Sequence, residues 1–124
     1  MSDVLNDFYK INTLEVVDTI ATAIITVNKD HTIFKGHFPG NPVMPGVCMM
    51  QIIKDITEKV VDKKLFMQSA GNVKFMAIIN PNNTPELELE MAITEVEGGG
   101  YKVKNISKFG DTIALKLTTN FIAK

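Results

Sequence analysis

The sequence contains no arginine and no tryptophan, only one cysteine, and no long apolar run. All 13 basic residues are therefore lysines, and the chain lacks the side chain best suited to bidentate contacts with phosphate or carboxylate. Basic and acidic residues nearly balance at a net charge of −1, which argues against nucleic acid as a partner. Because the lone Cys48 cannot form an internal disulfide, no oxidising compartment is implied, and we expect a cytoplasmic protein. No apolar run approaches the roughly 18 residues of a transmembrane helix, so we expect no membrane span.

What is present fits one domain over residues 1–124, without a repeat or a linker-like stretch. Runs rich in Val, Ile and Thr, or alternating in polarity, predict strands at 13–27, 32–34, 71–79, 86–96, 101–108 and 112–122. Three successive glycines at 98–100 predict a hairpin turn between two of these strands. The acidic strand 86–96 then lies beside a lysine-rich one, so we expect cross-strand ion pairs in a register that the loop length leaves open.

Residues 46–61 predict one long helix that begins directly after Pro45. Met49, Ile53, Ile56 and Val60 form its apolar stripe. The first two turns are apolar on most sides, so we expect the start of the helix to be more buried than its end. One buried helix and about five or six strands, mostly joined by turns, predict an α+β protein in which an antiparallel sheet wraps around the helix.

A loop at 37–46, HFPGNPVMPG, precedes this helix, and its three prolines and two glycines give it an irregular, defined path. The loop places His37 near the helix N-terminus, where Gly46 and Val47 carry the first free backbone N–H donors. An imidazole beside such donors suits proton transfer next to a polarised carbonyl. The alternative interpretation is that His37 is only a structural or exposed residue of the loop.

The other soft side chains suggest no site of their own. His31 follows an aspartate in a turn-like stretch and is expected to be exposed. No metal site is expected, since His31, His37 and Cys48 have neither zinc-finger nor zincin spacing. Cys48 lies within the apolar start of the helix, which indicates a core residue and not a nucleophile.

The run GHFPGNPVMPGV at 36–47 resembles the active-site signature of the β-hydroxyacyl-acyl-carrier-protein dehydratases of fatty-acid synthesis, which are hot-dog-fold proteins. The resemblance implies dimers, or multiples of dimers, with two acyl tunnels between the subunits. It also implies a 3-hydroxyacyl thioester of acyl carrier protein as substrate, without a metal or redox cofactor. By the same resemblance, His37 removes the α-proton, while Gly46, with Val47 beside it, holds the thioester carbonyl. The loop that shapes the site corresponds to Phe38, Pro39, Gly40, Pro42 and Pro45.

One position departs from this family at the centre of its chemistry. The family has a catalytic glutamate fourteen residues after the histidine, reaching the site from the partner subunit, and that position here is Gln51. A carboxamide can hydrogen-bond a hydroxyl but cannot give and take a proton as a carboxyl does. The chain is therefore a dehydratase with His37 as sole acid and base, an acyl-thioester-binding subunit of a heterodimer with a second hot-dog chain, or a hot-dog thioesterase. Alternatively, Gln51 simply begins the polar side of the helix with Lys54 and Glu58.

A second departure follows the strand residues NVKF at 72–75, where KFMAIINPNN replaces the family's basic and Pro-Gly-Asp run. Without arginine, contacts with an acidic carrier protein fall to lysines, and the candidates are Lys35, Lys63, Lys64 and Lys74. Three methionines, Met44, Met49 and Met50, either line the acyl tunnel or pack in the core. The sequence leaves open whether the thioester is carried by acyl carrier protein or by coenzyme A.

Overall fold

The structure, a computed structural model, describes residues 8–28, 30, 44, 46–77, 79–80 and 85–123. Within these residues the chain forms one helix and six strands. In chain order they are β1 (Tyr9–Val17), β2 (Ile20–Val27), α1 (Gly46–Val61), β3 (Leu65–Phe75), β4 (Glu86–Val96), β5 (Gly100–Phe109) and β6 (Thr112–Ala123). The observed helix α1 has the same bounds as the helix predicted from the sequence. The expected short strand at 32–34 lies outside the described residues.

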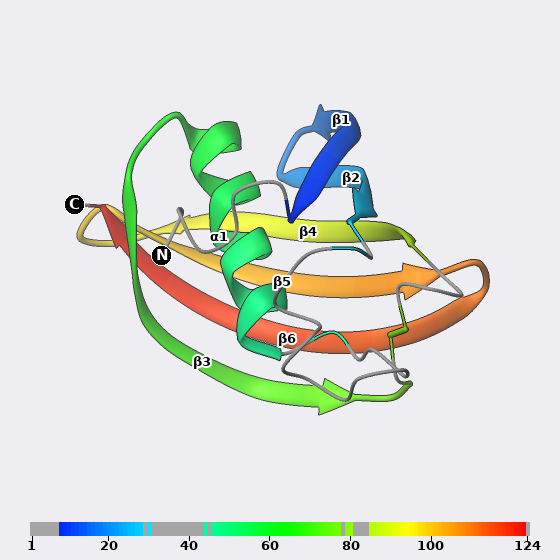
Figure 1. The fold of residues 1–124 in the computed structure, drawn as a ribbon. Helices are drawn as coiled ribbons and strands as arrows, with labels where there is room; N and C mark the ends of the chain where they lie inside the picture. Colours follow the sequence, from blue (N-terminus) through cyan, green and yellow to red (C-terminus); the bar gives the residue numbers. More distant parts are fainter. Residues whose placement is uncertain are drawn as a thin grey trace.

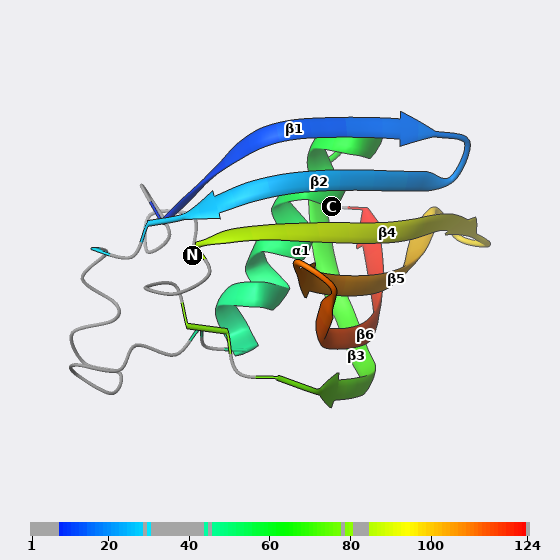
Figure 2. The same ribbon diagram turned by 90° about the vertical axis from the view of Figure 1, so that its right-hand side faces the viewer.

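The six strands form one antiparallel sheet in the order β1-β2-β4-β5-β6-β3. The sheet curves around α1, which lies against its concave face (Figure 1, Figure 2). This arrangement confirms the α+β prediction and is the hot-dog fold that the family resemblance implies. No helix in the described part of the chain is long and apolar enough to cross a membrane.

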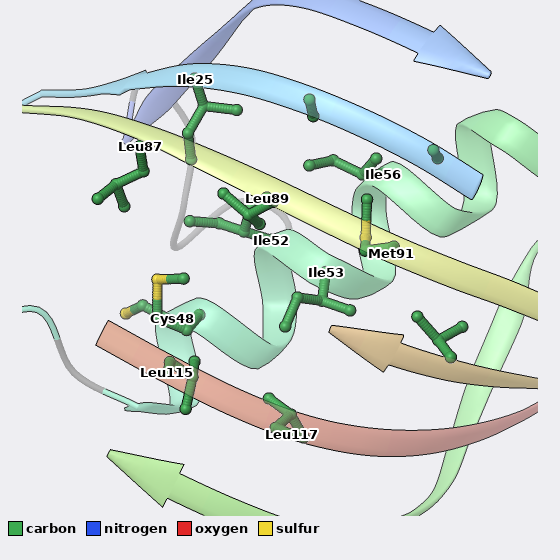
Figure 3. Packing of buried hydrophobic residues seen from close by; sticks show 14 of the residues in the cluster. Ile25, Cys48, Ile52, Ile53, Ile56, Leu87, Leu89, Met91, Leu115 and Leu117 are labelled. Atoms are coloured by element: carbon green, nitrogen blue, oxygen red, sulfur yellow. The ribbon is translucent and has the colours of Figure 1, made fainter. Parts of the chain in front are cut away.

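The core lies between α1 and the concave face of the sheet (Figure 3). Met49, Ile53 and Ile56 of the predicted stripe are fully buried, and Ile52 beside them is buried as well. Strand β4 alternates as its sequence predicts, since its inward side chains are all buried: Leu87, Leu89, Met91 and Ile93. Cys48 and Met49 near the helix start are buried, whereas Lys59 in the last turn is exposed, in the direction expected from the apolar first two turns.

The glycine turn follows the prediction, and the charged strands follow it in one of their pairs. Gly98 and Gly99 adopt φ values of +85° and +81°, a backbone region that glycine enters at little cost. The turn sets a register in which Glu88 lies opposite Lys108, and their side chains form an ion pair of 3.2 Å. Elsewhere the register places lysines opposite uncharged residues, as for Lys102 opposite Thr94.

Two predicted strands are wrong in their extent. Residues 13–27 are not one strand, because β1 and β2 form a hairpin in which Asp18 turns the chain with a φ of +55°. Aspartate tolerates this left-handed conformation, so a turn exists inside a Val/Ile/Thr-rich run without glycine or proline. The strand predicted at 71–79 instead spans Leu65–Phe75. It pairs with β6 alone at one edge of the sheet, where most of its side chains are exposed and no clean alternation is required.

Candidate functional site

The N-terminus of α1 is the first element of the candidate site. Gly46 is the first helical residue, and the ring of Phe75 from the end of β3 lies directly over it. A Cβ added to Gly46 would stand 2.8 Å from Phe75 Cζ, so the ring approaches the helix start closely because glycine has no side chain. Before the helix, the N–H of Met44 donates to the carbonyl of Ile79 at 2.9 Å. The segments before α1 and after β3 therefore meet at the helix start.

A helix N-terminus presents backbone N–H groups without intrahelical acceptors, together with a partial positive charge. Such donors suit a carbonyl oxygen on which negative charge develops. The apolar ring of Phe75, itself 56% exposed, adds a hydrophobic wall beside them. This end of the helix can therefore hold the polarised carbonyl of a substrate whose remaining chain is apolar.

Gln51 lies farther along α1, about 7.5 Å from Gly46 along the helix axis at 1.5 Å per residue. It is partly buried, and its Nε2 donates to Asp55 Oδ1 at 2.9 Å, one turn later on the same face. The second carboxylate oxygen, Asp55 Oδ2, accepts a hydrogen bond of 3.2 Å from the hydroxyl of Tyr9 on β1. Gln51, Asp55 and Tyr9 therefore form one polar network between the helix and the edge strand β1.

Burial, followed by the nearby Asp55 carboxylate and the hydrogen bond to it, raises the pKa of Tyr9. The phenol is therefore protonated throughout the physiological range and acts toward Asp55 as a donor. An ionised carboxylate has only acceptor sites, so both of its neighbours must present hydrogens to it. This requirement fixes which end of the Gln51 amide faces Asp55.

A second pair on the same helix is separate from this network. Lys54 and Glu58 form an ion pair of 3.6 Å, and Glu58 also accepts a hydrogen bond of 2.7 Å from the backbone N–H of Leu65. Glu58 thus ties the end of α1 to the start of β3. Gln51 shares the polar side of the helix with this pair, but its own partner is Asp55 and the side chain of Tyr9 reaches that partner from β1.

The remaining predicted residues divide into those the structure places and those it does not. His37, Phe38, His31 and Lys35 lie outside the described residues, and Val47 is placed in the helix without its side chain. Cys48 is only 3% exposed, and burial raises the pKa of its thiol, as expected for a core cysteine. Met49 and Met44 are buried in the core, whereas Met50 is partly buried against it.

Three residues of the site were missed by the sequence analysis. Asp55 carried a recoverable signal, because a residue four positions after Gln51 lies next to it on a helix. Tyr9 precedes the segment that was predicted as a strand, and nothing in the pattern indicates that it reaches the helix. Phe75 belongs to a predicted strand, but its contact with Gly46 depends on the position of β3 at the sheet edge beyond β6.

Comparison with known proteins gives the family context of this geometry. Residues 14–109 match the family model of the ApeI-like dehydratases. The chain is 31% identical over 99 residues to the 3-hydroxyacyl-[acyl-carrier-protein] dehydratase FabZ of a Caulobacter species, covering 73% of this chain and 58% of that protein. It is also 31% identical over 110 residues to the FabZ of Lactobacillus helveticus, covering 83% and 72%. The chain thus spans about three fifths of the length of the Caulobacter relatives.

Among solved structures, the dehydratase heterocomplex ApeI:P from Xenorhabdus doucetiae superposes with a TM-score of 0.72 at 18% identity. The match covers 91% of this chain and 96% of that one. At this level of identity the likeness establishes the fold of the sheet and helix.

Proposed function

Because the chain belongs to the ApeI-like dehydratase family, we propose that it removes water from a 3-hydroxyacyl thioester to give a 2-enoyl thioester. The observation that carries the proposal is the position of Gln51. It lies on α1 beyond the helix N-terminus, partly buried and held by a hydrogen bond to Asp55, at the place where the resembled family has its catalytic glutamate. The names of the relatives, 3-hydroxyacyl-[acyl-carrier-protein] dehydratases, support the same reaction.

The reaction is an elimination across C2 and C3 of the acyl chain. The thioester carbonyl accepts hydrogen bonds from the backbone at Gly46 and Val47, which makes the C2 proton more acidic. His37 takes that proton, the C3–O bond breaks as the C2–C3 double bond forms, and the departing hydroxyl leaves as water with a proton returned by His37. Gln51 hydrogen-bonds the 3-hydroxyl but supplies no proton.

The purified chain should by itself convert a short 3-hydroxyacyl thioester into its 2-enoyl product, because His37 can serve as base and then as acid. Two signals should be followed in one assay: absorbance of the enoyl thioester and release of free thiol. Enoyl formation without thiol release supports the dehydratase, whereas thiol release alone would identify a thioesterase. The assay should use both acyl carrier protein and coenzyme A as carriers, since either is compatible with the proposal.

The second candidate is an acyl-thioester-binding subunit that works with another hot-dog chain. It is favoured by one observation, the amide at position 51, since an acidic group from a partner chain would then be needed. The name of the ApeI:P structure, a heterocomplex, supports such an arrangement for a protein of this fold. A purified chain that binds the substrate, fails to turn it over, and gains activity only with a second chain would support this candidate over the first.

We further propose that two copies associate through β3, directly or as part of a larger assembly. This strand lies at an edge of the sheet and carries exposed apolar side chains, and Met76 follows it: Phe66, Val73, Phe75 and Met76. An exposed apolar edge strand is prone to pair with a second sheet.

Light scattering should accordingly give at least a dimer at micromolar concentration. Val73→Lys should shift the chain toward monomer, because it places a charge on the edge. Val96→Lys is the matched control, since Val96 is similarly exposed but ends β4 inside the sheet. A stable wild-type monomer would contradict both the assembly and a site shared between subunits.

A further inference from the structure

The hydrogen bonds around Asp55 bear on which substrate the site accepts, and this argument rests on the dehydratase function proposed above. Asp55 receives one hydrogen bond on each carboxylate oxygen, from Gln51 Nε2 at 2.9 Å and from the Tyr9 hydroxyl at 3.2 Å. These two donors come from different elements, α1 and β1. The carboxylate is therefore held from two sides, and its orientation does not depend on the helix alone.

The amide of Gln51 has two chemically opposite ends, a donor NH₂ and an acceptor oxygen. Since Asp55 is an acceptor, the amide must turn its nitrogen toward Asp55 and its Oε1 away. No described residue donates a hydrogen bond to Gln51 Oε1, while Nε2 has Asp55 as its acceptor. The oxygen thus remains available to a donor from outside the network.

We propose that Asp55 is a positioning residue that holds Gln51 as a hydrogen-bond acceptor and thereby makes the site select 3-hydroxyacyl over 3-oxoacyl thioesters. A 3-hydroxyl can donate to Gln51 Oε1. A 3-oxo group in the same place has only lone pairs, so two acceptors would face each other without a hydrogen between them. An unpaired, desolvated polar group of this kind is costly, and sites built to bind a donor discriminate strongly against ligands that lack one.

A free glutamine would show no such selectivity, because its amide rotates to present either end. Asp55→Asn tests this point. The asparagine amide can donate or accept, so it no longer dictates the orientation of Gln51, which can then turn its NH₂ toward a 3-oxo group. The variant is therefore expected to gain affinity for the 3-oxo ligand, an effect that structural damage would not produce.

The experiment measures binding by calorimetry with two amide analogues of acylated pantetheine, 3-hydroxybutyryl and 3-oxobutyryl, in which the amide linkage resists elimination. The wild-type protein should prefer the hydroxy analogue by about tenfold, or about 1.4 kcal/mol. In Asp55→Asn this preference should fall below about threefold, mainly through tighter binding of the oxo analogue. Tyr9→Phe, which removes one of the two hydrogen bonds to the carboxylate, should give an intermediate preference.

Two controls make the test specific. Glu58→Gln removes a negative charge from the same helix one turn later, outside the network, and should keep the wild-type preference. In a Gln51→Ala background, Asp55→Asn should change neither affinity, because Asp55 acts through Gln51. An unchanged preference in Asp55→Asn, or equal weakening of both analogues, would overturn the inference while leaving the proposed function standing. A wild-type protein that binds neither analogue would overturn the proposed function and this inference together.

Discussion

Replacing His37 with alanine should abolish dehydration while leaving the fold intact. A positioned acid or base contributes ~10²–10⁴ in rate. Here we expect the upper end of that range, an increase of about 5.4 kcal/mol in the activation free energy. Gln51 cannot transfer a proton, so His37 must serve both as the base and as the acid. The rate constant kcat/KM for 2-enoyl formation, measured with the purified chain, is the relevant quantity. The reverse hydration should be lost to the same extent, since both directions pass through one transition state.

His31→Ala is the matched control for this variant. It removes the other histidine of the chain, which the sequence places in an exposed turn, and it should keep the wild-type rate. Circular dichroism should show the same spectrum for both variants and the wild type. Wild-type turnover by His37→Ala would mean that the loop at 37–46 is only structural, and the proposed elimination would need a different base.

The parts of this fold that the sequence predicts well are those in which one local pattern decides the outcome. Pro45 and the apolar stripe through Met49, Ile53 and Ile56 specify α1, whose observed bounds are those predicted. Strand β4 alternates in polarity and has the predicted bounds because only one of its faces is buried. In both cases the period of the sequence equals the period of the structure.

Other features depend on contacts between distant segments, and local patterns cannot predict them. The β1–β2 hairpin turns at Asp18 within a run of strand-forming residues, so the pattern shows no break there. Phe75 reaches Gly46 because β3 pairs with β6 at the sheet edge. Tyr9 reaches Asp55 from β1, the strand at the other edge of the sheet. Both contacts depend on the order of the strands in the sheet, and the periodicity of the sequence does not predict that order.

The Gln51–Asp55 pair shows how a local rule and a long-range contact combine. The spacing of four residues on a helix predicts that these two side chains meet, whatever the rest of the fold does. The carboxylate only accepts hydrogen bonds, so its chemistry fixes which end of the Gln51 amide faces it. The spacing does not predict that a phenol holds the second carboxylate oxygen, because that contact comes from β1.

Gln51→Glu should raise the rate of dehydration by at least about tenfold, because it restores a proton donor at almost the same volume. The structure adds a reason for this expectation. Gln51 Nε2 lies 2.9 Å from Asp55 Oδ1, so the substitution would bring a carboxyl oxygen into the same contact. Two carboxyl groups at this distance cannot both ionise easily, and the pair retains one proton to higher pH than an isolated carboxyl would.

The proton that the two carboxyl groups share makes the stability of Gln51→Glu depend on pH in a predictable direction. A carboxyl whose folded-state pKa is raised binds more protons when folded than when unfolded, so its contribution to stability decreases as pH rises above the unfolded pKa. Relative to the wild type, the melting temperature of Gln51→Glu should therefore fall as the pH rises from about 5 to about 8, where an unfolded glutamate is ionised. The gain in rate should shrink over the same interval as the introduced carboxyl loses its proton.

Two comparisons isolate the donor from other effects of the substitution. Gln51→Ala removes the amide without adding an acid and should not be faster than the wild type. Adding Asp55→Asn to Gln51→Glu removes the neighbouring charge, so the introduced carboxyl should lose its proton at lower pH and the gain in rate should fade earlier. Rates should be measured as 2-enoyl formation from a short 3-hydroxyacyl thioester. If folded Gln51→Glu is no faster than the wild type at any pH, either Gln51 lies outside the reacting centre or the chemistry of this site requires the amide itself.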